Sequence, residues 1–156
     1  MSDVVEVPSP AIDAVDLVKT FDRGQVAALD RLSLRVEVGE YVAVTGPSGC
    51  GKSTLLHLIA ALDRPDSGEL RVAGHDLAQL EHPNHFRREA IGLVFQMHNL
   101  LPHLDVMANI GIAMLGSPRS RHEQRDRARE LVTAVGLEGL GGRRPQELSG
   151  GERQRV

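Results

Sequence analysis

Apolar and polar residues in the N-terminal part of the chain follow the spacing of β-strands. Residues Ile12–Phe21 are strand-like, and Leu32–Val38 alternates strictly before Gly39, which predicts a half-buried antiparallel strand. Two further runs, Tyr41–Thr45 and Ile91–Phe95, are almost entirely apolar and predict strands buried on both faces. The pattern therefore predicts a half-buried antiparallel strand followed by two fully buried strands.

Helical spacing follows the first buried run and returns in the second half of the chain. The positions i, i+3, i+4 and i+7 of one helix face are filled by Leu55, Leu58, Ile59 and Leu62. The other predicted elements are turns over 22–24 and 63–68, a short strand over 70–72, helical turns over 84–90, and helices over 106–114 and 120–135. Strands that alternate with helices along the chain place it in the α/β class.

Composition narrows the kind of protein further. The chain has 156 residues, enough for one domain with a core, and a net charge of only −3, so no basic field points to nucleic acid. The arginines of the 120–135 helix alternate with acids and lack aromatic neighbours, which indicates a solvated face. No apolar run approaches the roughly 18 residues of a membrane span. The single cysteine, Cys50, excludes an internal disulfide and fits a reducing cytosol.

The stretch between the first buried run and the first helix carries the candidate chemistry. It reads Gly46-Pro47-Ser48-Gly49-Cys50-Gly51-Lys52-Ser53-Thr54 and matches G-x-x-x-x-G-K-[ST], a phosphate-binding loop. A strand end and a helix start flank the loop, so unpaired N–H groups and the helix dipole converge on an anion. Lys52 is expected to reach the β- and γ-phosphates, and Ser53 to hold Mg²⁺. The chain has sixteen arginines but only two lysines, Lys19 and Lys52. Because it otherwise prefers arginine, a lysine at this position indicates a site that suits a compact ammonium group rather than a planar guanidinium.

A second motif closes the sequence given. Ser149 and Glu152 have the spacing of a capping box at the start of a helix. Between them, Gly150 and Gly151 each cost roughly 1 kcal/mol of helix propensity, which a merely structural helix start does not favour. Two glycines leave N–H groups open to close approach, so the motif predicts a second anion site.

With both motifs present, residues 12–156 resemble the ATP-binding subunits of ABC transporters. The signature of that family, L-S-G-G-[EQ]-x-Q, is matched in full by Leu148–Gln154. The residues Phe95–Pro102 and Glu147–Val156 are most similar to the lipoprotein-release and macrolide-export branch. The resemblance implies ATP and Mg²⁺ as ligands and ATP hydrolysis as the activity of an intact member.

The resemblance also assigns roles by position. Phe21 matches the aromatic residue that stacks on adenine, although the family usually has tyrosine there. Gln96 matches the glutamine that touches Mg²⁺ and the attacking water and signals to the membrane subunit. Ser149 and Gly151 match residues that contact the γ-phosphate of ATP held by another subunit. The implied site residues are Lys52 and Gln96 for catalysis; Phe21, Gly46 to Thr54, Ser149, Gly150 and Gly151 for nucleotide; and Ser53 and Gln96 for metal.

The implied fold is α/β: a P-loop NTPase core with a mixed sheet, an antiparallel β subdomain at its N-terminus and an inserted α-helical subdomain. Its expected divisions are a loose terminus over 1–10, the β subdomain and P-loop core over 11–96, the helical subdomain over 97–150, and the start of the signature helix over 151–156. The implied partners are a second nucleotide-binding subunit, bound head to tail, and an integral membrane transport subunit. We therefore expect a protein peripheral to the cytoplasmic face of a membrane.

In the family, a Walker B acid, a catalytic glutamate and a switch histidine follow the signature helix. The sequence given stops at Val156, and no earlier apolar run ends in Asp-Glu. We therefore expect a partial reading of a longer protein, incomplete at the C-terminus. We expect it to hydrolyse ATP negligibly by itself and to aggregate through an open strand edge.

Two other functions use the same two motifs: a non-transport ABC protein acting on ribosomes or DNA, and a nucleotide-binding fragment without activity. A P-loop kinase or GTPase shares only the first motif and leaves Leu148–Gln154 unexplained. The residues do not identify a transported substrate.

Overall fold

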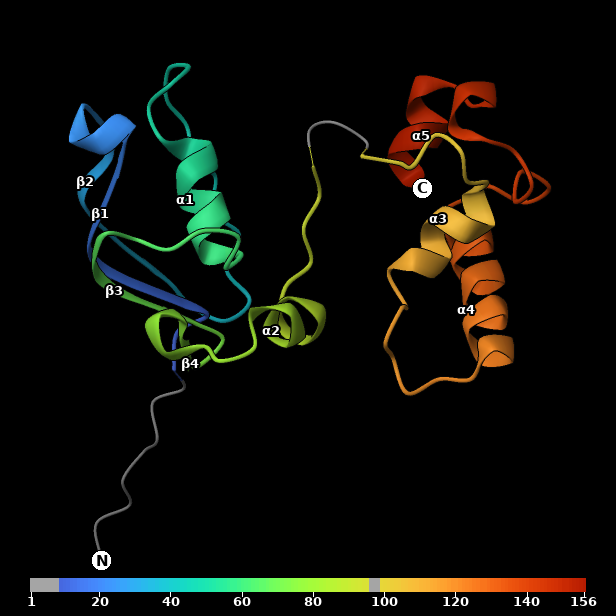
Figure 1. Cartoon of the computed structure of the whole chain (residues 1–156), viewed down its shortest axis with the longest axis horizontal. Coiled ribbons are helices and arrows are strands. Elements are labelled where there is room, and N and C mark those ends of the chain that lie inside the picture. The colour runs from blue at the N-terminus through green and yellow to red at the C-terminus, as the bar shows by residue number, and fades with distance from the viewer. Residues whose placement is uncertain (1–8, 96–98) are drawn as a thin grey trace, which may run out of the picture. The chain divides into compact units, whose positions relative to one another are not determined.

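The computed structural model describes residues 9–95 and 99–156, and the chain separates into two compact units, Met1–Leu93 and Val94–Val156. The first unit contains the sheet with helices α1 and α2, and the second contains α3, α4 and α5 (Figure 1). In the described part of the chain, no helix combines the length and apolar character that crossing a bilayer requires.

The sheet of the first unit has the strand order β2-β1-β3-β4, with every pair antiparallel. Its strands are β1 (Ile12–Phe21), β2 (Val26–Val36), β3 (Ser67–Val72) and β4 (His75–Asp76). The first strand and the turn after it are confirmed, the turn as the 3₁₀ segment η1 (Asp22–Gly24). The second strand begins at Val26 rather than Leu32, because the hairpin pairs Phe21 with Val26 directly across the turn.

Helix α1 (Lys52–Ile59) packs on this sheet through the predicted face. Leu55 and Leu58 are buried and join Leu17 and Leu70 of the strands in one core cluster. Leu62, predicted on the same face, lies beyond the helix end and is 45% exposed. The 3₁₀ segment η2 (Leu77–Gln79) and helix α2 (Pro83–Ala90) complete the unit, and α2 confirms the helical turns predicted over 84–90.

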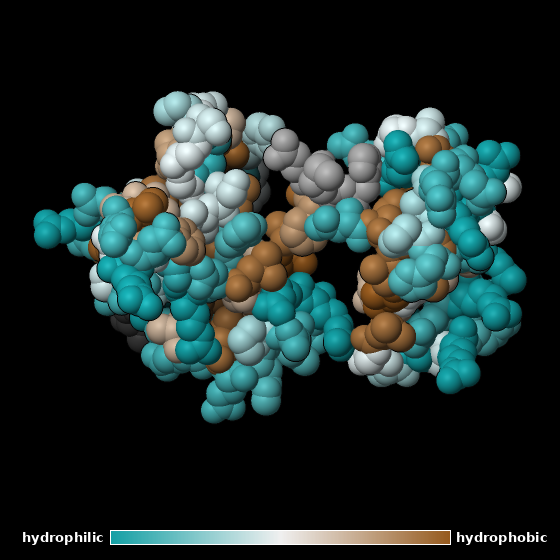
Figure 2. All heavy atoms as spheres, turned by 45° about the horizontal axis from the view of Figure 1, so that its top comes forward, coloured by the Kyte–Doolittle hydropathy of each residue, from teal (hydrophilic) through white to brown (hydrophobic). Residues whose placement is uncertain are grey.

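Two predicted strands are wrong. Tyr41–Thr45 and Ile91–Phe95 belong to no strand of the described sheet, and Val42 and Val94 are 40% and 86% exposed. A continuous apolar run indicates burial, but a strand also needs a neighbour that pairs with its N–H and C=O groups. None of the four described strands supplies one. Figure 2 shows one face of the molecule, on which apolar side chains reach the surface among polar ones.

The second unit is helical, with α3 (Val106–Ile112), α4 (Arg121–Ala134), the 3₁₀ segment η3 (Pro145–Glu147) and α5 (Gly150–Arg155). Its core cluster is built from the buried residues Val106, Val132, Leu137 and Leu148. Side chains cap three helices at their start: Asp105 for α3, Ser120 for α4 and Ser149 for α5. The predicted helices are therefore confirmed, with ends moved by one or two residues.

Candidate nucleotide-binding site

Helix α1 begins where the predicted phosphate loop presses against the sheet. Gly51, the N-cap of α1, has a φ of +89°, which favours glycine over every L-residue. A Cβ atom on Gly51 would lie 2.2 Å from the carbonyl oxygen of Ala28 and 3.0 Å from Leu29 Cδ2, both in β2. The fold therefore requires a glycine at position 51, because the loop backbone packs directly against β2.

The N-terminus of α1 has no side chain that neutralises it. Over the described loop and first turn, no side-chain cap is formed and no acidic residue is present. In contrast, α3 and α5 are capped by Asp105 and Ser149. Residues 46–50 are exposed. The unpaired N–H groups and positive dipole end of α1 therefore face an accessible loop, an arrangement that suits an anion.

Lys52 adds a full positive charge inside the curve of the loop. Its Nζ donates hydrogen bonds to the carbonyl oxygens of Gly46, at 2.8 Å, and Pro47, at 2.6 Å, and lies 3.4 Å from Cys50 Sγ. Gly46 and Pro47, which hold the ammonium, are the first residues of the loop, and Gly51 at the other end of the loop is the N-cap of α1. Ser53, the next residue, is exposed. The structure thus brings together a cation, a hydroxyl and a helix N-terminus, which together can bind a polyphosphate.

Phe21, the predicted base-stacking residue, lies at the same end of the β1–β2 hairpin as the loop. It pairs with Val26 and follows Thr20, which pairs with Ala27, whereas the loop touches Ala28. The Phe21 side chain is 42% exposed, so part of its ring is free to pack against a ligand. Gln96 lies outside the described residues.

Sequence patterns do not single out Lys19, which the structure places beside Phe21. Its Nζ donates to Asp63 Oδ1 at 2.9 Å and to the carbonyl oxygen of Arg64 at 2.8 Å, and it lies 5.4 Å from the centroid of the Phe21 ring. The hydrogen bond from Lys19 holds the pKa of the Asp63 carboxyl below its usual range. The available signal was that Lys19 is one of only two lysines in an arginine-rich chain.

The predicted second motif forms the N-terminus of α5. The capping box is confirmed: Ser149 N donates to Glu152 Oε2 at 2.7 Å, and Glu152 N donates to Ser149 Oγ at 3.3 Å. These bonds lower the pKa of the Glu152 carboxyl, the backbone bond first. Leu148 is buried, whereas Ser149, Gly150 and Gly151 are exposed. The Ser149–Gly151 tip is therefore anchored at its base and accessible at its end.

The two glycines of this tip are not required by their own surroundings. Among the described residues, apart from its chain neighbours and the backbone of its own helix, a Cβ atom on Gly150 would have no heavy atom within 4 Å, and one on Gly151 would meet only Arg155 Nη1 at 3.8 Å. Neither glycine has a positive φ. Neither local packing nor backbone conformation therefore explains why glycines occupy positions 150 and 151, and contact with another molecule would explain it.

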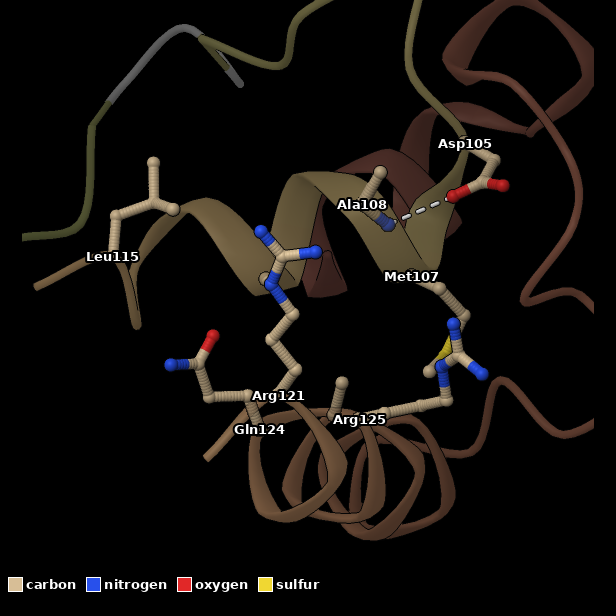
Figure 3. Close-up of a pocket in the computed structure, with 9 residues that line it drawn as sticks. Asp105, Met107, Ala108, Leu115, Arg121, Gln124 and Arg125 are labelled. Carbon is tan, nitrogen blue, oxygen red and sulfur yellow. Dashed lines mark hydrogen bonds between the residues drawn. The ribbon is translucent and has the colours of Figure 1, made fainter. Parts of the chain in front are cut away.

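A groove of about 510 Å³ lies between α3 and α4 within the second unit. Met107 and Leu115 line it from the α3 side, and Arg121, Gln124 and Arg125 extend into it from α4 (Figure 3). At its rim, Asp105 accepts a hydrogen bond from Ala108 N at 2.7 Å. The groove contains none of the residues predicted to bind nucleotide.

An antiparallel sheet, a phosphate loop pressed on that sheet and a separate helical unit ending in an open Ser-Gly-Gly tip define a P-loop NTPase of the cassette type. The chain belongs to the ABC transporter family, whose model matches residues 29–156. This finding and the solved cassettes below confirm the predicted family and fold class.

Known proteins also resemble the chain closely. It is 47% identical over 133 residues to the lipoprotein-releasing system ATP-binding protein LolD of Chromohalobacter salexigens, covering 84% of this chain and 56% of that protein. It is 39% identical to the macrolide export ATP-binding/permease protein MacB of Rhodospirillum rubrum, covering 98% and 24%. Among solved structures, the dimeric ATP-binding cassette MJ0796 bound to ADP and Pi matches with a TM-score of 0.82 and 34% identity, covering 92% of this chain and 66% of that one.

These relatives confirm the resemblance to the lipoprotein-release and macrolide-export branch. The chain spans a little over half the length of LolD and a quarter of MacB.

Proposed function

We propose that this chain is the ATP-binding part of an ABC transporter, with the triphosphate of ATP held by Gly46–Thr54 and the adenine stacked on Phe21. One observation carries the proposal: the Lys52 ammonium is fixed inside a loop that opens an uncapped helix. Such a helix end attracts phosphate oxygens, and the ammonium neutralises them. Within this proposal the nucleotide core extends over residues 11–96 and the helical subdomain over 97–150.

Mg²⁺ fits this site as a partner of the phosphates rather than of a protein cage. Among the described residues, no group of three or more His, Cys, Asp or Glu side chains could hold a metal ion. Mg²⁺ commonly keeps several waters and binds one or two protein oxygens beside substrate phosphates. The exposed hydroxyl of Ser53, next to Lys52, is suited to be one such ligand, with Gln96 as the second assigned residue. When bound, the ion supplies charge neutralisation at the phosphates.

The open Ser149–Gly151 tip supports a role toward a second nucleotide-binding subunit. We assign it to the γ-phosphate of ATP bound by that subunit, in a head-to-tail pair. The exposed position of the tip and the lack of any internal need for its glycines support this assignment. The related cassette MJ0796 is described as dimeric.

The complete protein would couple ATP binding and hydrolysis to an integral membrane partner at the cytoplasmic face of a membrane. The relatives LolD and MacB carry lipoprotein release and macrolide export in their names, which favours an export or extraction system. The 156-residue chain itself is expected to hydrolyse ATP negligibly. Phosphoryl transfer needs an acid that holds the metal and a group that orients the attacking water, and no apolar run of the given sequence ends in Asp-Glu.

Isothermal titration of the chain with Mg²⁺ and ATP tests the loop assignment. Replacing the ammonium by an apolar chain, Lys52→Met, is expected to weaken ATP binding about ten- to a hundredfold, as expected for a lost hydrogen bond to a charged group. The matched control is Arg129→Met, which removes an exposed cation from α4 in the other unit and should leave ATP binding unchanged. Equal affinities of the wild-type chain and Lys52→Met would contradict the proposal.

A further inference from the structure

The end of β1 has a strand on only one side within the described sheet. Its pairing with β2 continues to Phe21, but its pairing with β3 ends at Val18 and Ser67. On the other side, Asp66 replaces the missing strand: its Oδ2 accepts hydrogen bonds from Thr20 N at 2.7 Å and Thr20 Oγ1 at 2.8 Å, and its N–H donates to the Val18 carbonyl at 2.8 Å. The turn that follows α1 therefore holds the last residues of β1.

Lys19 is the buried residue among those that connect the end of β1 to the turn after α1. The residue is only 9% exposed, which is unusual for a lysine, and its Nζ contacts Asp63 at 2.9 Å and lies 3.8 Å from Asp66 Oδ1. The register with β2 shifts on both sides of Lys19, and such irregularities re-aim side chains. The hydrogen bonds of Lys19 and Thr20 thus hold the end of β1 on the side where it has no neighbouring strand.

The same ammonium contacts the ring assigned to the base. Lys19 and Phe21 are two residues apart in β1, and the contact between their side chains shows that both lie on one face of the sheet. Lys19 Nζ lies over the Phe21 ring, 5.4 Å from its centroid, a distance at which a cation is attracted to the π-system. Because Asp63 and Asp66 hold the ammonium, the ammonium in turn restricts the ring.

We propose that Lys19 is a positioning residue for nucleotide binding, which holds the Phe21 ring in the orientation that stacks on a purine base. The inference rests on the proposed function, which assigns Phe21 to adenine. Lys19 acts through the ring, whereas the phosphate loop is fixed separately by Gly51 on β2 and by the buried Leu55 of α1. Loss of the Lys19 charge should therefore reduce the contribution of the base to the affinity for ATP and leave the contribution of the phosphates unchanged.

The test compares ATP with inorganic triphosphate, both with Mg²⁺, by isothermal titration of the chain. Lys19→Met and Phe21→Leu are each expected to weaken ATP binding about three- to thirtyfold and to change triphosphate binding less than about twofold. The double variant should bind ATP no more weakly than Phe21→Leu alone, because the two residues act as one unit. Lys19→Arg keeps the cation and should retain most of the preference for ATP over triphosphate.

Arg35→Met is the matched control, because it removes an exposed ion pair with Glu37 at the other end of the β1–β2 hairpin. It should bind ATP as the wild-type chain does. Thermal melting monitors folding; if Lys19→Met does not fold, Asp63→Asn weakens the same attachment from its exposed side.

Equal loss of ATP and triphosphate binding in Lys19→Met, or no loss of either, would overturn the positioning role. Additive losses in the double variant would overturn it as well. A wild-type chain that binds neither ligand would overturn the proposed function itself, and the inference with it.

Discussion

Two helices of this chain start at glycines, and they do so for different reasons. At α1, the fold requires Gly51, because its φ is +89° and a Cβ atom would come within 2.2 Å of Ala28 O. At α5, no described residue outside the local backbone lies within 4 Å of a Cβ atom on Gly150, so a larger residue would fit. The first glycine serves the chain's own packing, and the second serves no purpose that the described residues reveal.

The capping of these helices differs in the opposite sense. Helix α5 is closed by the reciprocal bonds of Ser149 and Glu152, whereas α1 has no side-chain cap. The α1 terminus therefore leaves its charge for a ligand held by the same chain, close to Lys52. The α5 terminus is stable by itself and leaves only a bare surface, which suits a ligand presented from outside. A glycine in a motif thus needs a structural test before it is given a functional role.

Gly51→Ala is expected to give the largest effect. It combines a left-handed backbone with a backbone clash, so we expect a loss of about 3 kcal/mol or more in the free energy of unfolding, together with loss of ATP binding. Urea denaturation measures the first. Gly49→Ala is the control for backbone strain alone, since Gly49 has a φ of +80° and an added Cβ atom would meet no described residue within 4 Å beyond its chain neighbours. It should cost about 1–2 kcal/mol. Equal stability of the two variants would show that the contact with β2 is unimportant.

Gly150→Ala should have a smaller effect on stability, in the other direction. Alanine favours a helix by up to about 1 kcal/mol over glycine, and the position has room for it. We expect unchanged or slightly raised stability, unchanged ATP affinity, and loss of any ATP-dependent self-association in sedimentation. Gly142→Ala, an exposed glycine of the same unit with open space around it, is the control that should leave association intact. A clear destabilisation by Gly150→Ala would mean that the fold needs this glycine too.

The pH dependence of the α5 cap is the smallest effect. The pKa of Glu152 lies below its ordinary value of 4.5 because Ser149 donates to the ionised carboxylate. A depressed pKa contributes stability above the ordinary value, and this contribution is lost as the pH falls through the folded pKa. Wild-type and Glu152→Gln chains should therefore differ slightly in melting temperature at pH 7 and converge below pH 4.5. A difference that stayed constant over this range would contradict the role of the charge.

The parts of the fold that depend on neighbouring residues could be predicted from the sequence. The strand Ile12–Phe21, the capping box at Ser149 and the start of α1 directly after the glycine-rich loop all follow from spacing over a few residues. The strands predicted at Tyr41–Thr45 and Ile91–Phe95 failed because apolar content does not supply a pairing partner.

The parts of the site that depend on distant residues could not be predicted. Lys19 meets Asp63 across 44 positions of sequence, and Gly51 meets Ala28 only after the loop folds onto β2. The motif predicts that a glycine is present in the loop, but only the fold shows which backbone atom excludes a side chain there.

The central claim, that the α1 terminus binds ATP from its own chain, is tested most directly by a two-dimensional NMR titration of the ¹⁵N-labelled chain with Mg²⁺ and ATP. We predict that the amide signals of Gly46–Thr54, apart from Pro47, which has no N–H group, shift at every protein concentration. Those of Gly150 and Gly151 should shift only when the chain is concentrated enough to pair. Loop signals that stay in place at saturating ATP would contradict the account.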